Sequence, residues 1–384
     1  MKVVGIICEY NPFHNGHARQ IRLIRENWGE DTAVVCLMSG NYVQRGAPAV
    51  YPKVLRAEAA LAAGADLVLE LPTTYALRSA EGFAAGGVEI LGAFCDGLCF
   101  GAENADPKPL TDIAKALLSQ EYRDHLRQEL DLGLSFPAAR EQALEAMGLD
   151  HELVRTPNNI LAVEYCKAIL SSGTAMAPLP ITRGGDYHAT APEEENPSAT
   201  ALRRLIGEKE DLDRYVPAEA AGIFAHAPVH TLAAGERAML SKLRTMTEEE
   251  FSRLPFGSEG LWRKLMHECR RQPTLEQIAQ GVKSKRYTRT RIDRMILCAF
   301  LGITEEMLEA QAPYTRVLGL NDRGRQVLRM AREKTALVNI GQNTGHDWQE
   351  AEHHWGALYG LFAEGCPEPP DAEEKLRLIY RKEN

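Results

Sequence analysis

Short apolar runs alternate with amphipathic stretches through the first hundred residues of the chain. Some of the apolar runs have the length and the β-branched content of buried strands, and these are residues 3–7, 33–38, 66–71 and 98–100. The stretches between them have helical periodicity, and these are residues 18–26, 53–63 and 81–91. Brief Gly, Asn and Pro segments separate the elements, so the alternation predicts an α/β fold in which helices cover both faces of a parallel sheet. Ligands of such sheets bind at the carboxyl ends of the strands.

The pattern becomes helical and charged over residues 110–147, which predicts an insertion or a lid on the sheet. A capped helix is predicted from residue 157, and a strand followed by a loop is predicted from residue 178.

Later segments divide the chain into three predicted parts. Residues 1–211 are predicted to form the ligand-binding α/β domain, and residues 212–306 contain helical patterns without a clear strand. Residues 307–384 mix short apolar runs with helices, which predicts a small α+β C-terminal part. This last part either stands alone or closes back on the sheet.

The composition is that of an ordinary globular protein, with 45% hydrophobic residues in a chain of 384. The net charge of −9 argues against a protein whose whole surface coats nucleic acid, but it allows a local basic patch. The N-terminus leads directly into a strand pattern, and no apolar run reaches the roughly 18 residues that a membrane helix needs. We therefore expect a cytoplasmic protein without a membrane span.

Eight cysteines are scattered mostly through apolar segments and form no CxxC pair. Zinc sites typically use such closely spaced pairs. We therefore interpret the cysteines as reduced packing residues and expect no tightly bound metal.

Candidate chemistry lies directly after the first predicted strand, in the segment CEYNPFHNGH. His14 is predicted to precede a helix and His17 to lie in its first turn, so both imidazoles project to one side. Helix N-termini attract phosphate through exposed N–H groups and the macrodipole, and Gly16 allows a phosphate or an adenine to approach the backbone. These features predict a triphosphate site. The alternative is a polar turn in which Asn11 or His14 caps the helix.

Two motifs resemble those of the nucleotidyltransferase superfamily. The sequence HNGH at residues 14–17 resembles its HxGH signature, and SATALR places Ser198, Thr200 and Arg203 in the spacing of its second motif, Ser-x-Thr-x-x-Arg. The resemblance implies a Rossmann-like sheet for residues 1–211, with the second motif closing the other side of the triphosphate. For SATALR alone, an ordinary N-capped helix is the alternative interpretation.

Longer strings resemble one family within this superfamily, the bacterial tRNA(Met) cytidine acetate ligases. The similar segments extend over roughly the first 300 residues, and they are GIICEYNPFHNGH, MSGNYVQRGAP, ADLVLELP, CFGAE, PNNILAVEY and KSKRYTRTRIDR. The resemblance implies an enzyme that activates acetate with ATP, giving acetyl-adenylate and pyrophosphate. It also implies transfer of the acetyl group to the wobble cytidine of elongator tRNA(Met), which yields N4-acetylcytidine.

The resemblance further implies which residues bind ATP. Gly101 leaves room for adenine or ribose, an asparagine at 158 or 159 both donates and accepts hydrogen bonds, and Arg183 offers a charged fork to phosphate. Each of these also fits a structural role, as a turn, a helix cap or a surface ion pair. The implied ATP-binding residues are Ile7, Cys8, Glu9, Tyr10, Asn11, Pro12, Phe13, Asn15, Gly16, Ala18, Arg19, Gln20, Gly101, Asn158, Asn159, Arg183, Ser198 and Thr200.

Acyl adenylation is an in-line attack of a carboxylate on the α-phosphorus, so the enzyme supplies mainly alignment and positive charge. We expect His14, His17 and Arg203 to be the catalytic residues, with Mg²⁺ assisting at the phosphates.

The loop SGNYVQRG follows the second predicted strand. Gln44 and Arg45 in this loop are candidates for contact with acetate or the cytidine, and Lys53 at the start of the next helix is a further phosphate candidate. A purely structural role fits all three equally well.

A dense basic segment predicts the contact with tRNA. Residues 283–294 contain a single acid, Asp293, among many basic side chains. Such clustering neutralises phosphates, and a tyrosine within it can stack on a base. The ordinary alternative is a solvated helix face. The predicted tRNA-binding residues are Lys283, Lys285, Arg286, Tyr287, Arg289, Arg291 and Arg294.

Two other functions fit part of the sequence. A small-molecule adenylyltransferase would share HxGH but would leave the helical domain and the basic segment unexplained. An RNA-binding protein that keeps the fold without chemistry would be expected to have lost at least one residue of the two motifs, whereas this chain retains His14, Gly16, His17, Ser198, Thr200 and Arg203. Acetate-dependent release of pyrophosphate separates the ligase from the first alternative, and any turnover excludes the second.

Overall fold

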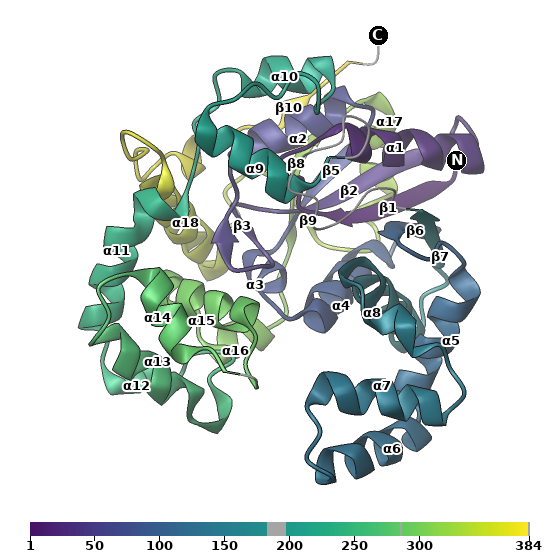
Figure 1. Cartoon of the computed structure of the whole chain (residues 1–384). Coiled ribbons are helices and arrows are strands. Elements are labelled where there is room, and N and C mark those ends of the chain that lie inside the picture. The colour runs from purple at the N-terminus through teal and green to yellow at the C-terminus, as the bar shows by residue number, and fades with distance from the viewer. Residues whose placement is uncertain (183–196, 285, 383–384) are drawn as a thin grey trace.

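A mainly parallel sheet forms the centre of the computed structural model, which describes residues 1–182, 197–284 and 286–382 (Figure 1). The strand order is β10-β8-β5-β2-β1-β6-β7, and β9 pairs with β8. Among the described strands of this sheet, β5 and β8 pair antiparallel and the other neighbours pair parallel. The strands are β1 (Val3–Cys8), β2 (Ala33–Ser39), β5 (Leu67–Leu71), β6 (Gly97–Ala102), β7 (Ala177–Thr182), β8 (Thr315–Leu320), β9 (Leu337–Asn339) and β10 (Ile379–Tyr380).

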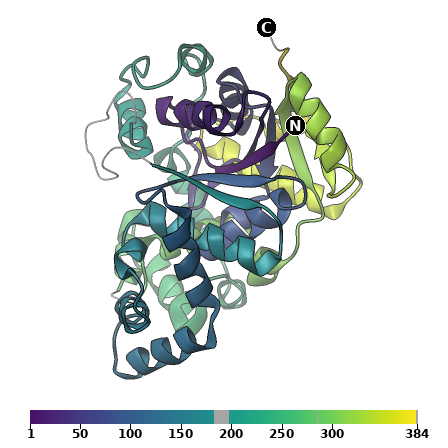
Figure 2. The same ribbon diagram turned by 90° about the vertical axis from the view of Figure 1, so that its right-hand side faces the viewer.

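Helices cover both faces of the sheet, as the alternation in the sequence predicted (Figure 2). Within β1, Val4 and Ile6 belong to the core on one face, whereas Val3 and Ile7 belong to the core on the other. The first face packs against α1 (Asn15–Trp28), α2 (Lys53–Ala62), α9 (Ala199–Glu208) and α10 (Ala218–Phe224). The second face packs against α4 (Ala80–Leu91), α5 (Pro107–Leu118), α8 (Pro157–Ser172) and α17 (Asp322–Ala331).

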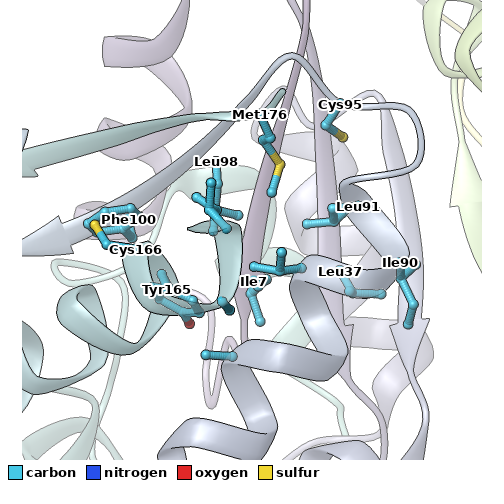
Figure 3. Close-up of a cluster of buried hydrophobic side chains, with 14 of the residues drawn as sticks. Ile7, Leu37, Ile90, Leu91, Cys95, Leu98, Phe100, Tyr165, Cys166 and Met176 are labelled. Carbon is cyan, nitrogen blue, oxygen red and sulfur yellow. The ribbon is translucent and has the colours of Figure 1, made fainter. Parts of the chain in front are cut away.

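The core on the second face is visible in Figure 3, where Ile7, Leu37 and Leu98 from three strands meet Leu91 of α4 and Tyr165 of α8. The strands are buried on both faces, which is why each read as a nearly continuous apolar run. The four strands predicted from these runs are confirmed as β1, β2, β5 and β6, with ends that differ by at most two residues.

The order of the strands creates a switch point beside β1. The chain leaves β1 for β2 and β5 on one side, and it later returns to β6 on the other side of β1. In open α/β sheets, ligands bind outside the carboxyl ends of the strands at such a point. The segment with the two histidines connects β1 to α1 and therefore lies at this place.

The C-terminal strands complete the main sheet and form no separate one. β8 pairs with β5, and β9 and β10 pair with β8. The prediction of a separate part over residues 307–384 is therefore corrected in favour of the alternative in which this segment closes back on the sheet. The physical reason is that β8 satisfies the backbone of β5, which would otherwise be an exposed edge.

A helical unit extends away from the sheet, at the lower left of Figure 1. It packs around its own apolar core, to which α18 (Asp347–Tyr359) contributes Trp355 and Tyr359 from the C-terminal segment. The predicted boundary at residue 212 needs correction, because α10 packs on the sheet side, where Phe224 stacks on Tyr51 at 4.6 Å. The unit comprises α11 (Leu232–Thr245), α12 (Glu248–Ser252), η2 (Ser258–Gly260), α13 (Leu261–Cys269), α14 (Leu275–Val282), α15 (Arg289–Leu301) and α16 (Glu305–Glu309).

Smaller elements join these layers. The charged stretch over residues 110–147 is helical as predicted, and its helices α6 (Gln120–Asp131) and α7 (Phe136–Ala146) project at the lower right of Figure 1. A hairpin of β3 (Tyr42–Val43) and β4 (Ala47–Pro48) follows β2. The remaining short helices are α3 (Thr73–Ala76), η1 (His151–Val154), η3 (Gly360–Phe362) and η4 (Glu373–Lys375).

Two further predictions concern the packing role of the cysteines and the membrane-spanning potential of the helices. All eight cysteines are free, and six of them are buried, which confirms the packing role for those six, whereas Cys366 is exposed. None of the described helices is long and apolar enough to cross a membrane.

A buried cluster of charges ties the C-terminal segment to the sheet. Lys53 at the start of α2 bonds to Glu70 of β5 at 3.0 Å and to Glu373 of η4. Arg316 of β8 bonds to Glu70 and Glu373, both at 2.9 Å, and lies 3.4 Å from Glu352 of α18. All five side chains are buried. Because three carboxyl groups face two cations, one carboxyl lacks a full counter-charge.

Glu352 is the member of this cluster that we expect to make stability depend on pH. Burial, opposed in part by Arg316, raises the pKa of Glu352 from 4.5 to about 7. The folded state therefore binds more protons than the unfolded state between these values, so the free energy of unfolding falls as pH rises from about 4.5 to 7. Glu352→Gln should raise the free energy of unfolding by up to about 3 kcal/mol at pH 8 and by little near pH 4.5.

Urea unfolding of the wild type and of this variant at both pH values measures the difference. Glu374→Gln, which removes an exposed carboxyl from η4, next to Glu373 of the cluster, is the matched control and should change stability little at either pH. Equal effects of Glu352→Gln at the two pH values would contradict the assignment.

Candidate active site

A cavity of about 580 Å³ opens at the carboxyl ends of β1 and β6. Its wall combines the loop after β1, the start of α1, the β3–β4 hairpin, and parts of α4, α8, α9 and α11. Two sequence motifs that lie far apart in the chain meet here, since His14 and His17 line the cavity together with Ser198, Thr200 and Arg203. The convergence supports the interpretation of both motifs as parts of one site.

The two histidines are held against each other at the start of α1. His14 occupies the N-cap position and His17 the third helical position, and their rings stack with centroids 3.6 Å apart. The backbone N–H of His14 donates to Nδ1 of His17 at 3.2 Å. Because Nδ1 accepts this bond, the proton of the neutral His17 ring lies on Nε2. His17 lines the cavity with the ring whose Nε2 carries this proton.

Two aromatic rings fix the position of His17. Tyr10 and Phe13 lie with their ring centroids 4.7 and 5.6 Å from the ring of His17. Tyr10 has a φ of 48°, a backbone conformation that bulky residues rarely adopt. Its burial and the 3.3 Å contact of its hydroxyl with Sγ of Cys36 hold it there. The local conformation is therefore set by packing, as is common where a side chain must be aimed at a ligand.

Arg203 joins the second motif to the first. Its Nη1 donates to the backbone oxygen of Asn11 at 2.8 Å, and its Nη2 donates to Oγ1 of Thr200 at 3.1 Å. Burial lowers the pKa of Arg203, the charge of Glu9 opposes this effect and Arg45 adds to it. An arginine stays charged in proteins, so the cavity contains a partly desolvated cation, which attracts phosphate more strongly than an exposed one does.

Most of the predicted ATP-binding residues line this cavity, but some do not. Arg183 lies outside the described residues. Pro12, Phe13, Asn15 and Ala18 are absent from the described wall. The predicted residues that line it are Ile7, Cys8, Glu9, Tyr10, Asn11, His14, Gly16, His17, Arg19, Gln20, Gln44, Arg45, Gly101, Asn158, Ser198, Thr200 and Arg203.

The neighbouring asparagines at the start of α8 have different positions. Asn158 lines the cavity, whereas Asn159 is buried and its Oδ1 accepts the backbone N–H groups of Glu103 and Asn104 at 2.9 and 3.1 Å. Asn159 therefore shapes the loop after β6, and Asn158 is the candidate for contact with the nucleotide.

Lys53 is corrected as a phosphate candidate. Its ammonium group is almost fully buried, bonds to Glu70 and Glu373, and does not line the cavity described above. The start of a helix suggested a phosphate contact, but the partner on η4 lies too far along the chain for sequence spacing to reveal it.

Several basic side chains of the segment 283–294 form ion pairs, so less of their positive charge is available to tRNA than the sequence indicated. Arg289 pairs with Glu276 of α14 at 2.6 Å and with Asp293 at 2.8 Å. The Arg289 bond lowers the pKa of Glu276 to about 2. Arg286 pairs with Glu259, which also accepts the hydroxyl of Tyr287 at 3.0 Å. Two acids that are distant in sequence therefore offset part of the positive charge.

Arg291 and Arg294 bond to backbone oxygens of other segments of the protein. Arg291 donates to the backbone oxygen of Phe256 at 2.7 Å and lies over one face of Tyr287, which leaves only the other face for a base. Arg294 is buried and donates to the backbone oxygen of Gln44 at 3.3 Å, so its prediction as a tRNA contact is corrected. Lys283 is exposed and makes no ion pair within the described part of the chain, whereas Lys285 lies outside it.

Sequence reasoning missed one wall of the cavity. Phe83, Phe100, Ile160, Leu161 and Tyr165 give the cavity an apolar part of its wall. These side chains belong to strands and helices with ordinary core patterns, and nothing in the sequence separates a cavity wall from a core. His230 at the entry to α11 also lines the cavity, and an isolated histidine in a loop gave no signal.

No group of three or more His, Cys, Asp or Glu side chains within residues 1–182, 197–284 and 286–382 is arranged to hold a metal ion. This finding concerns a resident metal site and leaves open an ion that arrives with ATP.

The fold and the cavity define a class of protein. A strand, a loop with an HxGH sequence and a helix N-terminus at the switch point of a parallel sheet form a nucleotide site. The family model described as HIGH Nucleotidyl Transferase matches residues 1–362.

The relatives narrow the class. A protein named tRNA(Met) cytidine acetate ligase from Clostridium novyi (strain NT) is 36% identical over 356 residues, which cover 88% of this chain and 89% of that protein. The crystal structure of apo Thermotoga maritima TmcAL is similar with a TM-score of 0.89 and 30% identity over 100% of both chains. A second structure of TmcAL, bound with alpha-thio ATP, has a TM-score of 0.88 over 100% of both chains. This chain therefore belongs to the HIGH nucleotidyl transferases and, within them, to the tRNA(Met) cytidine acetate ligase family.

Proposed function

We propose that this protein is an ATP-dependent ligase that activates acetate as acetyl-adenylate and acetylates the wobble cytidine of elongator tRNA(Met). The product is N4-acetylcytidine, and AMP and pyrophosphate are released. The observation that supports this proposal best is the meeting of the HxGH and Ser-x-Thr-x-x-Arg motifs on one cavity, in a chain similar to proteins named for this reaction. We place the reaction in the cytoplasm and expect Mg²⁺ to bind with the triphosphate.

The first half-reaction needs alignment and positive charge. An oxygen of acetate attacks the α-phosphorus, the bond from the α-phosphorus to the bridging oxygen breaks, and pyrophosphate leaves. The N–H groups at the start of α1, the Nε2–H of His17 and the guanidinium of Arg203 surround the place where negative charge develops. When Mg²⁺ is bound, it would neutralise phosphate charge, and this chain's residues would hold the triphosphate in line.

The second half-reaction brings the tRNA to the same cavity. The β3–β4 hairpin carries Gln44 and Arg45 into the wall, and its tip contacts α15 of the helical unit. The basic residues of the segment 283–294 begin just before α15. A tRNA bound along this segment would therefore lie next to the hairpin, and its cytidine could enter beside the adenylate.

Acetate-dependent exchange between ATP and labelled pyrophosphate tests the first half-reaction. The proposal expects exchange that requires acetate and that does not require tRNA. ATP binding without any exchange in acetate, or exchange supported only by an unrelated cofactor precursor, would contradict it.

The double variant Lys285→Glu with Arg286→Glu tests the tRNA contact. Two reversed charges should weaken tRNA binding by more than about tenfold and reduce the salt dependence of affinity by about two phosphate contacts, while pyrophosphate exchange stays intact. Filter binding at several salt concentrations gives both quantities. Lys334→Glu, which changes an exposed lysine in the turn after α17 and outside the helical unit, is the control. Undiminished tRNA affinity in the double variant would contradict the assignment.

A further inference from the structure

The cavity wall contains one acidic side chain among the described residues, that of Glu9. Arg19, Arg45 and Arg203 line the same wall, as expected for a site that binds a triphosphate. A carboxylate repels phosphate oxygens, so Glu9 is out of place if the cavity serves ATP alone. Arg203 in the same wall offsets part of its charge, and the carboxylate can also accept hydrogen bonds from a ligand group.

Glu9 is held rigidly at both its backbone and its side chain. It directly follows β1, and its Oε1 accepts the backbone N–H of Gln44 at 2.7 Å. Its backbone oxygen accepts a bond from Nη1 of Arg56 at 2.5 Å. Arg56 is fully buried and also donates to the backbone oxygens of Tyr51, Ser39 and Gly40. Within the described chain, Oε2 of Glu9 has no hydrogen-bond partner, so it is the oxygen available to a ligand.

The contact with Gln44 connects Glu9 to the helical unit, which carries the predicted tRNA-binding segment 283–294. The backbone oxygen of Gln44 accepts a bond from Arg294 of α15, and Nε2 of Gln44 donates to the backbone oxygen of Arg78 at 3.4 Å. Gly46 at the hairpin tip has a φ of 80°, and a Cβ there would lie 2.4 Å from the backbone nitrogen of Arg294. The hairpin thus packs closely on α15. Through its bond to Gln44 of the hairpin, Glu9 lies near the place where the α/β part meets the helical unit.

We propose that Glu9 binds the exocyclic amino group of the target cytidine and accepts its proton during acetyl transfer. The inference rests on the proposed function and assigns the acceptor side of the same cavity. Carboxylates recognise cytosine by accepting a hydrogen bond from N4, the nitrogen that is acetylated. Oε2 of Glu9, with Oε1 fixed by Gln44, is placed for that role at a junction where a cytidine would meet acetyl-adenylate.

The transfer step balances with Glu9 as the base. N4 of the cytidine attacks the carbonyl carbon of acetyl-adenylate, and the bond between that carbon and the phosphate oxygen breaks with its electron pair on AMP. The attacking nitrogen becomes positively charged and therefore strongly acidic. Its proton passes to Oε2 of Glu9 and later to solvent. The products are N4-acetylcytidine and AMP, and Glu9 returns to its ionised form.

Glu9→Gln separates this role from a role in ATP binding. The amide keeps the size of the side chain and can still accept from Gln44, but it then presents an NH₂ group to the NH₂ group of cytidine and cannot take a proton. We expect acetyl transfer to tRNA from the enzyme-bound adenylate to slow by about 100-fold or more, as loss of a general base does. Because Glu9 lies in the same wall as Arg203, pyrophosphate exchange and trapping of acetyl-adenylate by hydroxylamine can also fall, but the ratio of transfer to exchange should drop by at least about 20-fold.

Two further variants complete the test. Glu9→Asp, which retains a carboxylate on a shorter side chain, should keep more transfer activity than Glu9→Gln. Glu26→Gln, which removes an exposed carboxylate from the other end of α1, should match the wild type in both assays. Parallel loss of exchange and transfer in Glu9→Gln would assign Glu9 to ATP or to its metal ion and overturn the inference, as would full retention of transfer. A wild-type enzyme that exchanges pyrophosphate but acetylates no tRNA would instead refute the proposed acceptor.

Discussion

Replacing His17 by alanine is expected to slow acetate-dependent pyrophosphate exchange by about 1,000-fold, which corresponds to about 4 kcal/mol of transition-state stabilisation. Tyr10, Phe13 and the backbone N–H of His14 fix the ring of His17, and this ring carries the Nε2–H donor. Charge develops on the phosphates in the transition state, so a donor that is already aligned contributes most at that stage. Binding of ATP should weaken much less than the rate falls.

The same variant should leave tRNA affinity within about twofold, because His17 lies in the first turn of α1 and does not belong to the basic segment 283–294. His226→Ala removes an exposed histidine that lies outside the cavity wall and should affect neither quantity. His17→Gln, which keeps a donor of similar reach, should recover part of the lost rate. Exchange in His17→Ala above about a tenth of the wild-type rate would contradict the assigned role.

Replacing Lys53 by methionine is expected to lower the free energy of unfolding by about 3–5 kcal/mol. The change leaves the buried carboxylates of Glu70 and Glu373 with Arg316 as their shared cation. Removing one partner of a buried ion pair costs far more than removing an exposed charge, because the remaining charge has no water to solvate it. Urea unfolding of the variant and of Lys115→Met, an exposed control, measures the difference.

A double variant tests the cause of this loss. Lys53→Met combined with Glu373→Gln removes one positive and one negative charge, so it should be less destabilised than the sum of the single changes. A loss below about 1 kcal/mol in Lys53→Met would contradict the view that Lys53 stabilises the fold. A large loss of ATP affinity in the folded variant would revive its role as a phosphate ligand.

The sequence predicted the sheet because its strands are buried on both faces. Each such strand, as in Val34, Val35 and Cys36 of β2, is an unbroken apolar run that stands out from helical periodicity. The histidine pair was equally visible, since the loop, the glycine and the helix start are adjacent in the chain. Local patterns of this kind depend on neighbouring residues alone.

Features that depend on distant partners could not be predicted. Lys53 appeared as a free cation because Glu373 lies at the other end of the chain. The basic segment appeared unopposed because Glu259 and Glu276 come from other elements. The place of β8 beside β5 likewise follows from tertiary packing, and a short apolar run does not specify its neighbour.

The most direct test of the central claim is to incubate the protein with ATP, Mg²⁺, labelled acetate and bacterial tRNA that lacks the modification, and then to analyse the nucleosides by mass spectrometry. The account predicts labelled N4-acetylcytidine at the wobble position of elongator tRNA(Met). Formation of acetyl-adenylate without a labelled nucleoside would contradict the assigned acceptor. Binding of ATP with neither product would contradict the ligase reaction itself.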